Sequence, residues 1–132
     1  MVLFRVKHLY LLLFITFLAA CKKDFASPQV KQAYEEVMRI HDEVMPETET
    51  IHKLQKRLKK EHSGKEDAKE LINRLERSDD GMMEWMGDFK LDRSAPVTEQ
   101  IEYLTRENTR ISKVSKDMRS SIDEAKAYLS SK

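Results

Sequence analysis

The sequence predicts an all-α protein: an up-down-up three-helix bundle built from antiparallel, coiled-coil-like hairpins. Charged residues make up 36% of the chain, whereas glycine and proline occur three times each, and this composition suits long solvated helices. Beyond the N-terminal segment, apolar residues recur at alternating steps of three and four, as on the buried seam of a helix. The period-two alternation of a β-strand does not compete with this pattern at any point.

The first predicted helix spans about residues 28–62. Ser27 followed by Pro28 is a typical helix start, with serine as the N-cap and proline at the first helical position. Ser63-Gly64 ends the helix, because glycine readily adopts the left-handed backbone of a helix terminus. Pro46 falls inside the pattern without shifting its phase, so we expect one continuous helix with a kink. The seam comprises Val30, Ala33, Val37, Ile40, Val44, Ile51, Leu54 and Leu58.

The second and third predicted helices span about residues 65–87 and 96–130. Gly87 is expected to end the second helix, and Ser94-Ala95-Pro96 to start the third with serine as its cap. Short links make successive helices antiparallel. Two polar residues enter the third seam, Asn108 and Ser115, which predicts a polar layer. The seams are Ala68, Leu71, Leu75, Ser78, Met82, Trp85 and Phe89, then Val97, Ile101, Leu104, Asn108, Ile111, Ser115, Met118, Ile122, Ala125 and Leu129.

A cleaved signal peptide, residues 1–20, is expected to precede the bundle. It has a short basic segment with Arg5 and Lys7, followed by the apolar run 9–20. This run is about a dozen residues long, against roughly 20 for a helix that crosses a bilayer. Small residues end the run directly before Cys21, which is the only cysteine of the chain.

Leu18-Ala19-Ala20-Cys21 resembles the lipobox of bacterial lipoproteins. The resemblance implies cleavage before Cys21, diacylglycerol on its sulfur and acylation of the new amine, and several acyl chains on one residue anchor a protein stably. The chain then divides into the signal peptide, a lipidated tether at 21–27 and a helical domain at 28–131. Similar lipoproteins reach the cell surface by an acidic signal just after the cysteine, whereas here Lys22-Lys23 precede a single Asp24. We therefore expect the bacterial cell envelope, with the protein anchored in the outer membrane and facing the periplasm.

The charge balance and the single thiol exclude several classes of function. Removal of residues 1–20 reduces the 24 basic residues to 22 against 23 acidic ones, so no basic excess remains to attract nucleic acid. Lipidation of Cys21 would consume the only thiol, which excludes disulfides, cysteine nucleophiles and thiolate metal sites. No zinc-protease, nucleophile-elbow or phosphate-loop motif is present. The sequence therefore predicts a membrane-anchored, non-enzymatic interaction or structural domain whose partner is an unidentified envelope protein, with room for self-association.

A second stripe on the first helix carries Met38, His41, Met45, Thr48 and His52. Folding the next helix back at Ser63-Gly64 pairs residues whose numbers sum to about 127, which sets Met45 level with Met82 and His41 level with Met86. Packing of flexible methionines in a kinked core is one interpretation. The alternatives are a partner-binding groove and a Cu(I) site. Soft Cu(I) would take the ligands His41, Met45, Met82 and Met86, with Met83 and Trp85 beside it.

Two sequence blocks are distinctive in combination. They are His41-Asp42-Glu43-Val44-Met45-Pro46 and Met82-Met83-Glu84-Trp85-Met86, the latter followed by Phe89 and then by Tyr103-Leu104. Together they resemble small helical lipoproteins of flavobacteria and related Bacteroidota, often labelled "viral A-type inclusion protein". The resemblance spans nearly the whole chain and implies an envelope lipoprotein. It supplies no catalytic residues.

Overall fold

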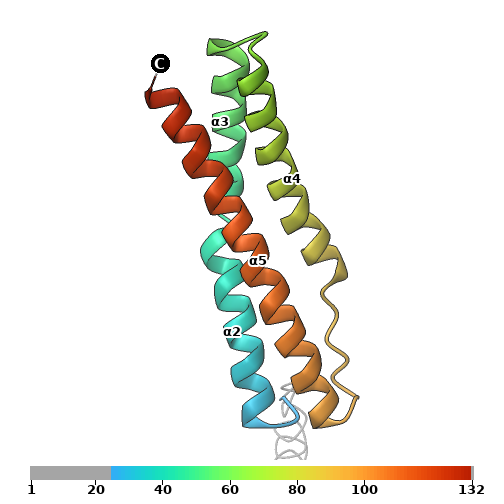
Figure 1. Cartoon of the computed structure of the whole chain (residues 1–132). Coiled ribbons are helices and arrows are strands. Elements are labelled where there is room, and N and C mark those ends of the chain that lie inside the picture. Colours follow the sequence, from blue (N-terminus) through green and yellow to red (C-terminus); the bar gives the residue numbers. More distant parts are fainter. Residues whose placement is uncertain (1–24, 132) are drawn as a thin grey trace, which may run out of the picture.

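The computed structural model describes residues 25–131, which form an all-helical protein with three helices packed together (Figure 1). The first helix is divided into α2 (Pro28–Val44) and α3 (Glu47–Glu61), the second is α4 (Glu66–Asp88) and the third is α5 (Val97–Ser130). α4 runs back along α3, and α5 then runs in the direction of α2 and α3, so the order is up, down, up. None of the described helices is long and apolar enough to span a bilayer.

The single kinked helix expected over 28–62 is interrupted at Met45 and Pro46. Proline has no N–H, so the turn cannot close its normal hydrogen bond there. Both residues keep right-handed helical backbone, with φ/ψ of −54°/−39° and −62°/−19°. The next bonds tighten to three-residue spacing, with the Thr48 N–H donating to Met45 O at 3.2 Å. The helix axis therefore stays nearly continuous, and the seam keeps its phase across the break.

The helix ends partly match their sequence signals. Ser27 caps α2 as predicted, because its Oγ accepts the Val30 N–H at 3.2 Å. Gly64 has the expected left-handed backbone, with φ +84°. Gly87 does not end the second helix, which continues to Asp88.

Ser94 does not cap the third helix, so that prediction is wrong. Its N–H and hydroxyl both donate to Asp92 Oδ1, at 2.8 and 2.6 Å, and form a turn ahead of the helix. α5 begins at Val97 without a side-chain cap.

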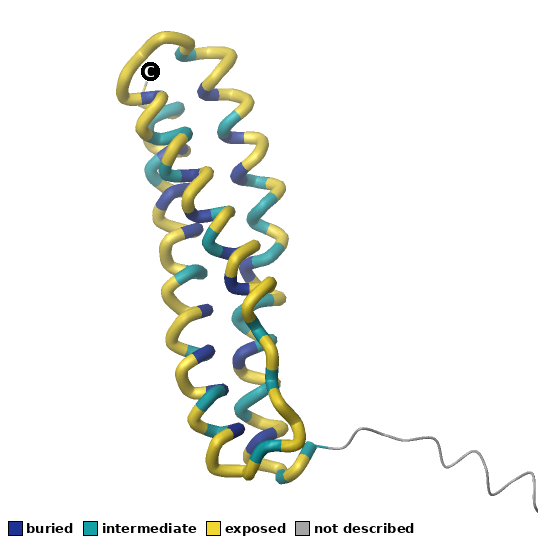
Figure 2. The backbone as a smooth tube through the Cα atoms, turned by 90° about the vertical axis from the view of Figure 1, so that its right-hand side faces the viewer, coloured by how far each residue is buried: buried dark blue, intermediate teal, exposed yellow. Residues whose placement is uncertain are grey.

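Buried residues line the inner side of each helix (Figure 2). The fully buried core is largely the predicted seam: Val30, Val37, Val44, Ile51, Leu58, Leu75, Met82, Leu104, Ile111, Met118 and Ala125 are 0% exposed. Val97, expected in the seam, is instead 39% exposed.

The predicted polar layer at Asn108 and Ser115 is wrong, since both side chains are only half-buried. The buried polar pair lies elsewhere, between Ser78 of α4 and Ser121 of α5, whose Oγ atoms are 2.9 Å apart. Both serines also donate to carbonyls of their own helices, those of Leu75 and Met118. A serine can meet its hydrogen-bonding needs locally in this way, so seam position alone does not show which polar residue is buried.

α4 is too short to accompany α5 along its whole length, and a non-helical strap takes its place (Figure 1). The strap is residues 89–96. Residues 89–92 have no regular secondary structure, and residues 93–95 form a turn ahead of α5. In this half of the bundle, the strap is the third element packed beside α2 and α5.

Candidate functional site: the cluster at the kink

The hairpin brings the two distinctive sequence blocks together. The His41 ring on α2 lies 5.6 Å from the Trp85 ring on α4, with 32° between their planes. The two residue numbers sum to 126, against about 127 expected from the turn at Ser63-Gly64. The predicted register of the hairpin is therefore confirmed at this level. We call His41, Met45, Met82, Met83, Trp85 and Met86 the kink cluster.

The four methionines of the kink cluster have different environments. Met82 is 0% exposed, and Met45 is half-buried against the core. Met83 and Met86, by contrast, are 51% and 37% exposed. Residues four apart share a helix face, so Met86 lies one turn from Met82, toward the end of α4. The kink cluster therefore extends from the buried core to the protein surface.

Two polar groups of the cluster define what it could bind. His41 Nδ1 lies 2.8 Å from Asp42 Oδ1, and the His41 side chain is 16% exposed. Trp85 is 3% exposed, and its indole N–H is buried without a hydrogen-bond acceptor. Nothing in the sequence pattern indicated this unpaired donor. Because Nδ1 faces Asp42, a metal held here would use His41 Nε2 and methionine sulfurs, a donor set suited to a soft ion.

No group of three or more His, Cys, Asp or Glu side chains suited to a metal ion occurs within residues 25–131. Farther along the predicted stripe, His52 Nε2 lies 3.1 Å from Asp79 Oδ2 and links α3 to α4. Asp79 Oδ1 and Thr48 Oγ1 are buried without hydrogen-bond partners. The stripe thus contacts α4 at His41 and at His52.

A chain of aromatic rings continues from the kink cluster toward the start of the bundle. Trp85 and Phe89 are 5.0 Å apart, Phe89 lies 6.0 Å from Tyr34, and Tyr34 lies 5.0 Å from Phe25. Tyr103 of α5 completes the chain at 5.8 Å from Phe89. Large flat side chains pack where α2 and α5 are accompanied by the strap. Sequence reasoning missed Phe25 and Tyr34 because neither falls on an apolar seam.

Hydrogen bonds from α5 hold the strap. Tyr103 Oη accepts the Lys90 N–H at 2.6 Å. The Gln100 amide, 1% exposed, donates to Ala95 O at 2.7 Å. Hydrogen bonds from Ser94 hold the pKa of Asp92 below its usual range. This buried glutamine and the aspartate turn fix a segment that has no regular secondary structure.

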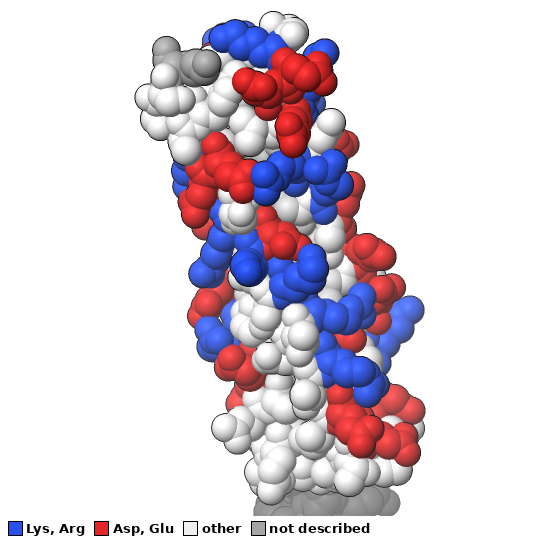
Figure 3. All heavy atoms as spheres, in the orientation of Figure 1, with Lys and Arg blue, Asp and Glu red and all other residues white. Residues whose placement is uncertain are grey.

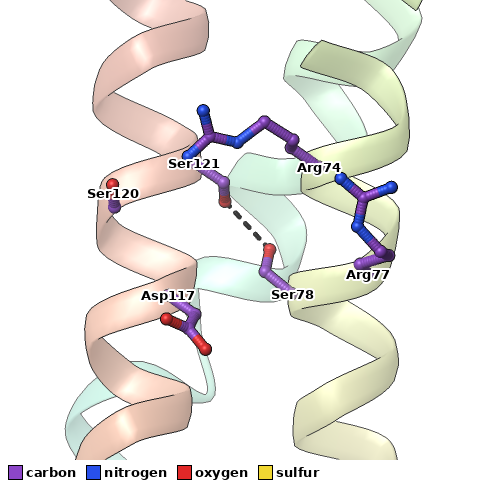
Figure 4. A pocket seen from close by; sticks show the side chains of 6 residues that line it. All are labelled: Arg74, Arg77, Ser78, Asp117, Ser120 and Ser121. Atoms are coloured by element: carbon purple, nitrogen blue, oxygen red, sulfur yellow. Dashed lines mark hydrogen bonds between the residues drawn. The ribbon is translucent and has the colours of Figure 1, made fainter. Parts of the chain in front are cut away.

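The groove between α4 and α5 is polar, with a volume of about 310 Å³ (Figure 4). The Ser78–Ser121 bond lies between the two helices. Arg74 pairs with Glu124, and Asp117 pairs with Lys113 at 2.5 Å. Since most of these groups are already paired within the protein, the groove secures the contact between α4 and α5. Its lining comprises Arg74, Arg77, Ser78, Asp117, Ser120 and Ser121.

The predicted lipidation site, Cys21, lies outside the described residues. Comparison with protein-family models, with curated proteins and with solved structures finds no match. Function must therefore be inferred from the residues of the chain and their geometry.

Proposed function

We propose that the protein is a lipid-anchored lipoprotein of the bacterial cell envelope whose helical bundle is a non-catalytic interaction or structural domain. The observation that carries the proposal is Cys21 at the end of a short apolar segment, six residues before the cap of the first helix. Within residues 25–131, residues of α2 to α5 form the buried core. We assign the N-terminal segment as the export signal, with Cys21 as the acylated residue.

The surface of the bundle supports an interaction or structural role. Acidic and basic side chains alternate along the middle of the face shown in Figure 3. Many form pairs within one helix, such as Lys31 with Glu35 at 2.9 Å. Arg39 bonds Glu36 and Glu43 together and keeps the pKa of Glu36 below its usual range. Such exposed pairs stabilise the fold little, but they keep long helices solvated.

The partner we propose is another envelope protein, reached from an outer-membrane anchor that faces the periplasm. Chemical crosslinking in intact cells tests this, with a chain lacking residues 1–20 as the matched control. Discrete crosslinked species should form with the full chain and disappear with the control, because export and anchoring bring the partners together. A full chain that crosslinks to no envelope protein would contradict an interaction role.

One observation favours the alternative of a Cu(I)-binding bundle. The His41 ring of α2 lies 5.6 Å from the Trp85 ring, which belongs to the part of α4 that carries Met82 and Met86. Cu(I) bound by His41, Met45, Met82 and Met86 should quench Trp85 fluorescence and raise the melting temperature. Titration of a chain beginning at Lys22 with Cu(I) under reductant measures both. Unchanged fluorescence and melting temperature at micromolar copper would eliminate the alternative.

A further inference from the structure

We propose that the end of the bundle nearest Cys21 rests on the bilayer surface, so that the opposite end points away from the membrane. We call residues 25–28 and 93–97 the tether-side end. The proposal rests on the lipid anchor proposed above, and it adds a defined membrane-contacting surface and an orientation of the bundle.

The first argument is the length of the tether. The Phe25 ring packs 5.0 Å from the Tyr34 ring, and the Arg93 guanidinium lies 4.4 Å from the centre of the Phe25 ring. Phe25 is therefore fixed to both α2 and the strap. Only residues 22–24 separate it from Cys21. Four residue steps reach at most about 14 Å, so an acylated Cys21 would hold this end close to the lipid headgroups.

The second argument is the shape of the bundle. α5 has 34 residues and begins at the tether-side end, so it is about 51 Å long at 1.5 Å per residue. The turn at Ser63-Gly64 lies at the opposite end (Figure 1). A tether about a quarter as long as the bundle fixes one end near the membrane and leaves the other free of it.

The third argument is the chemistry of the two ends. Exposed residues of the tether-side end include Ala26, Pro28, Pro96 and Val97, and Figure 3 shows few charges where α2 begins. Val97 is one of three large hydrophobic side chains exposed within residues 25–131. Arg93 is exposed beside the Phe25 ring and adds a positive charge that suits anionic headgroups. Apolar side chains accompanied by basic ones suit the bilayer interface.

The opposite end lacks these properties. Exposed charged side chains crowd the last turn of α3 and the first turn of α4, and none of the large exposed hydrophobic side chains lies there. Basic and acidic side chains are equal in number there, so this end offers the bilayer neither an apolar surface nor a basic excess. These residues are Lys59, Lys60, Glu61, Lys65, Glu66 and Asp67.

Fluorescence quenching by lipids with a nitroxide on the headgroup tests the orientation. The full chain is purified from membranes with a single added cysteine, Val97→Cys at the tether-side end or Ser63→Cys at the opposite end. An acylated Cys21 does not react with the thiol dye, so each chain carries one label. Both labelled chains are placed in vesicles of phosphatidylcholine and phosphatidylglycerol. Pro96→Cys replaces Val97→Cys if the latter lowers the melting temperature.

The label at Val97→Cys should lose fluorescence to the nitroxide lipid, and the label at Ser63→Cys should not. Equal quenching of the two labels, or quenching of neither, would overturn the orientation. A spectral shift at Val97→Cys that grows with protein density without nitroxide lipid would show that a second copy covers this end, and would also overturn it. The mass of the N-terminal peptide is read on the same samples. An unacylated Cys21 refutes the proposed anchor, whereas acylated chains with equal quenching refute only the orientation.

Discussion

Truncation of Met82 to alanine should destabilise the bundle far more than the same change at Met86. Met82 is 0% exposed in the middle of the core, whereas Met86, one turn away on the same helix, is 37% exposed. Removal of a buried methionine side chain costs about 2–5 kcal/mol, because transfer energy is lost and a cavity remains. A surface substitution away from such features stays within about 0.5 kcal/mol. The two variants carry the same substitution at the same residue type on the same helix, and they differ in how deeply the side chain is buried.

Urea and thermal unfolding of a chain beginning at Lys22 measure the difference. At roughly 4 °C per kcal/mol for a domain of this size, Met82→Ala should lower the melting temperature by about 8–20 °C. Met86→Ala should change it by about 2 °C or less. Circular dichroism reports on all helices and Trp85 fluorescence reports on the kink cluster. Coincident transitions by the two probes would show that the bundle unfolds as one unit.

Equal losses of stability in the two variants would refute this account of the kink cluster. So would a Met82→Ala variant as stable as the parent chain, because it would mean that the core does not depend on the methionine at its centre. Both measurements are made without copper, which keeps this prediction independent of the metal alternative.

Three further predictions concern the turn, the helix contact and the strap. Gly64→Ala should lower the unfolding free energy by about 1–2 kcal/mol because Gly64 has left-handed backbone. Gly81→Ala, inside α4 with open space around its Cβ position, should instead raise the unfolding free energy by about 0.5–1 kcal/mol. Urea titration measures both variants, and a stabilising Gly64→Ala would contradict the turn geometry. Ser78→Ala and Ser121→Ala should each lower the unfolding free energy by about 1 kcal/mol, and the double variant should lose less than the sum of the two. Strict additivity in this double-mutant cycle would mean that the hydrogen bond between the two serines does not contribute to stability. The pKa of Asp92 is lowered in the folded state, so its contribution to stability is present above the ordinary aspartate pKa of about 4 and is lost as pH falls through the folded value. Asp92→Asn should therefore be less stable than the parent chain at pH 7. A stability difference between the two that stays constant down to pH of about 2 would contradict this role.

Sequence periodicity predicted the helices and their register well, because each helix must bury a continuous apolar face. The His41–Trp85 contact follows directly from that rule and from the position of the Ser63-Gly64 turn. Which seam positions are deeply buried could not be read from the pattern, as Val97 shows. It lies in phase with the α5 seam but at the end of the bundle, where it is 39% exposed.

The strap could not be predicted either. Residues 88–95 were expected to form a loop. The packing of the strap as the third element of one half depends on Tyr103, Gln100 and the chain of aromatic rings. These are contacts between distant residues, and no local propensity encodes them. Gln100 illustrates the difficulty, since a polar residue in the first turn of a helix ordinarily suggests solvent exposure, yet it is 1% exposed.

The mass of the N-terminal peptide of the protein purified from bacterial membranes tests the central claim most directly. The lipoprotein account predicts a peptide that begins at Cys21 and carries diacylglycerol on sulfur and an acyl chain on the amine. Replacement of this residue, Cys21→Ser, should abolish both the lipid and the cleavage. A peptide that retains residues 1–20, or one that begins elsewhere with Cys21 unmodified, would contradict the account.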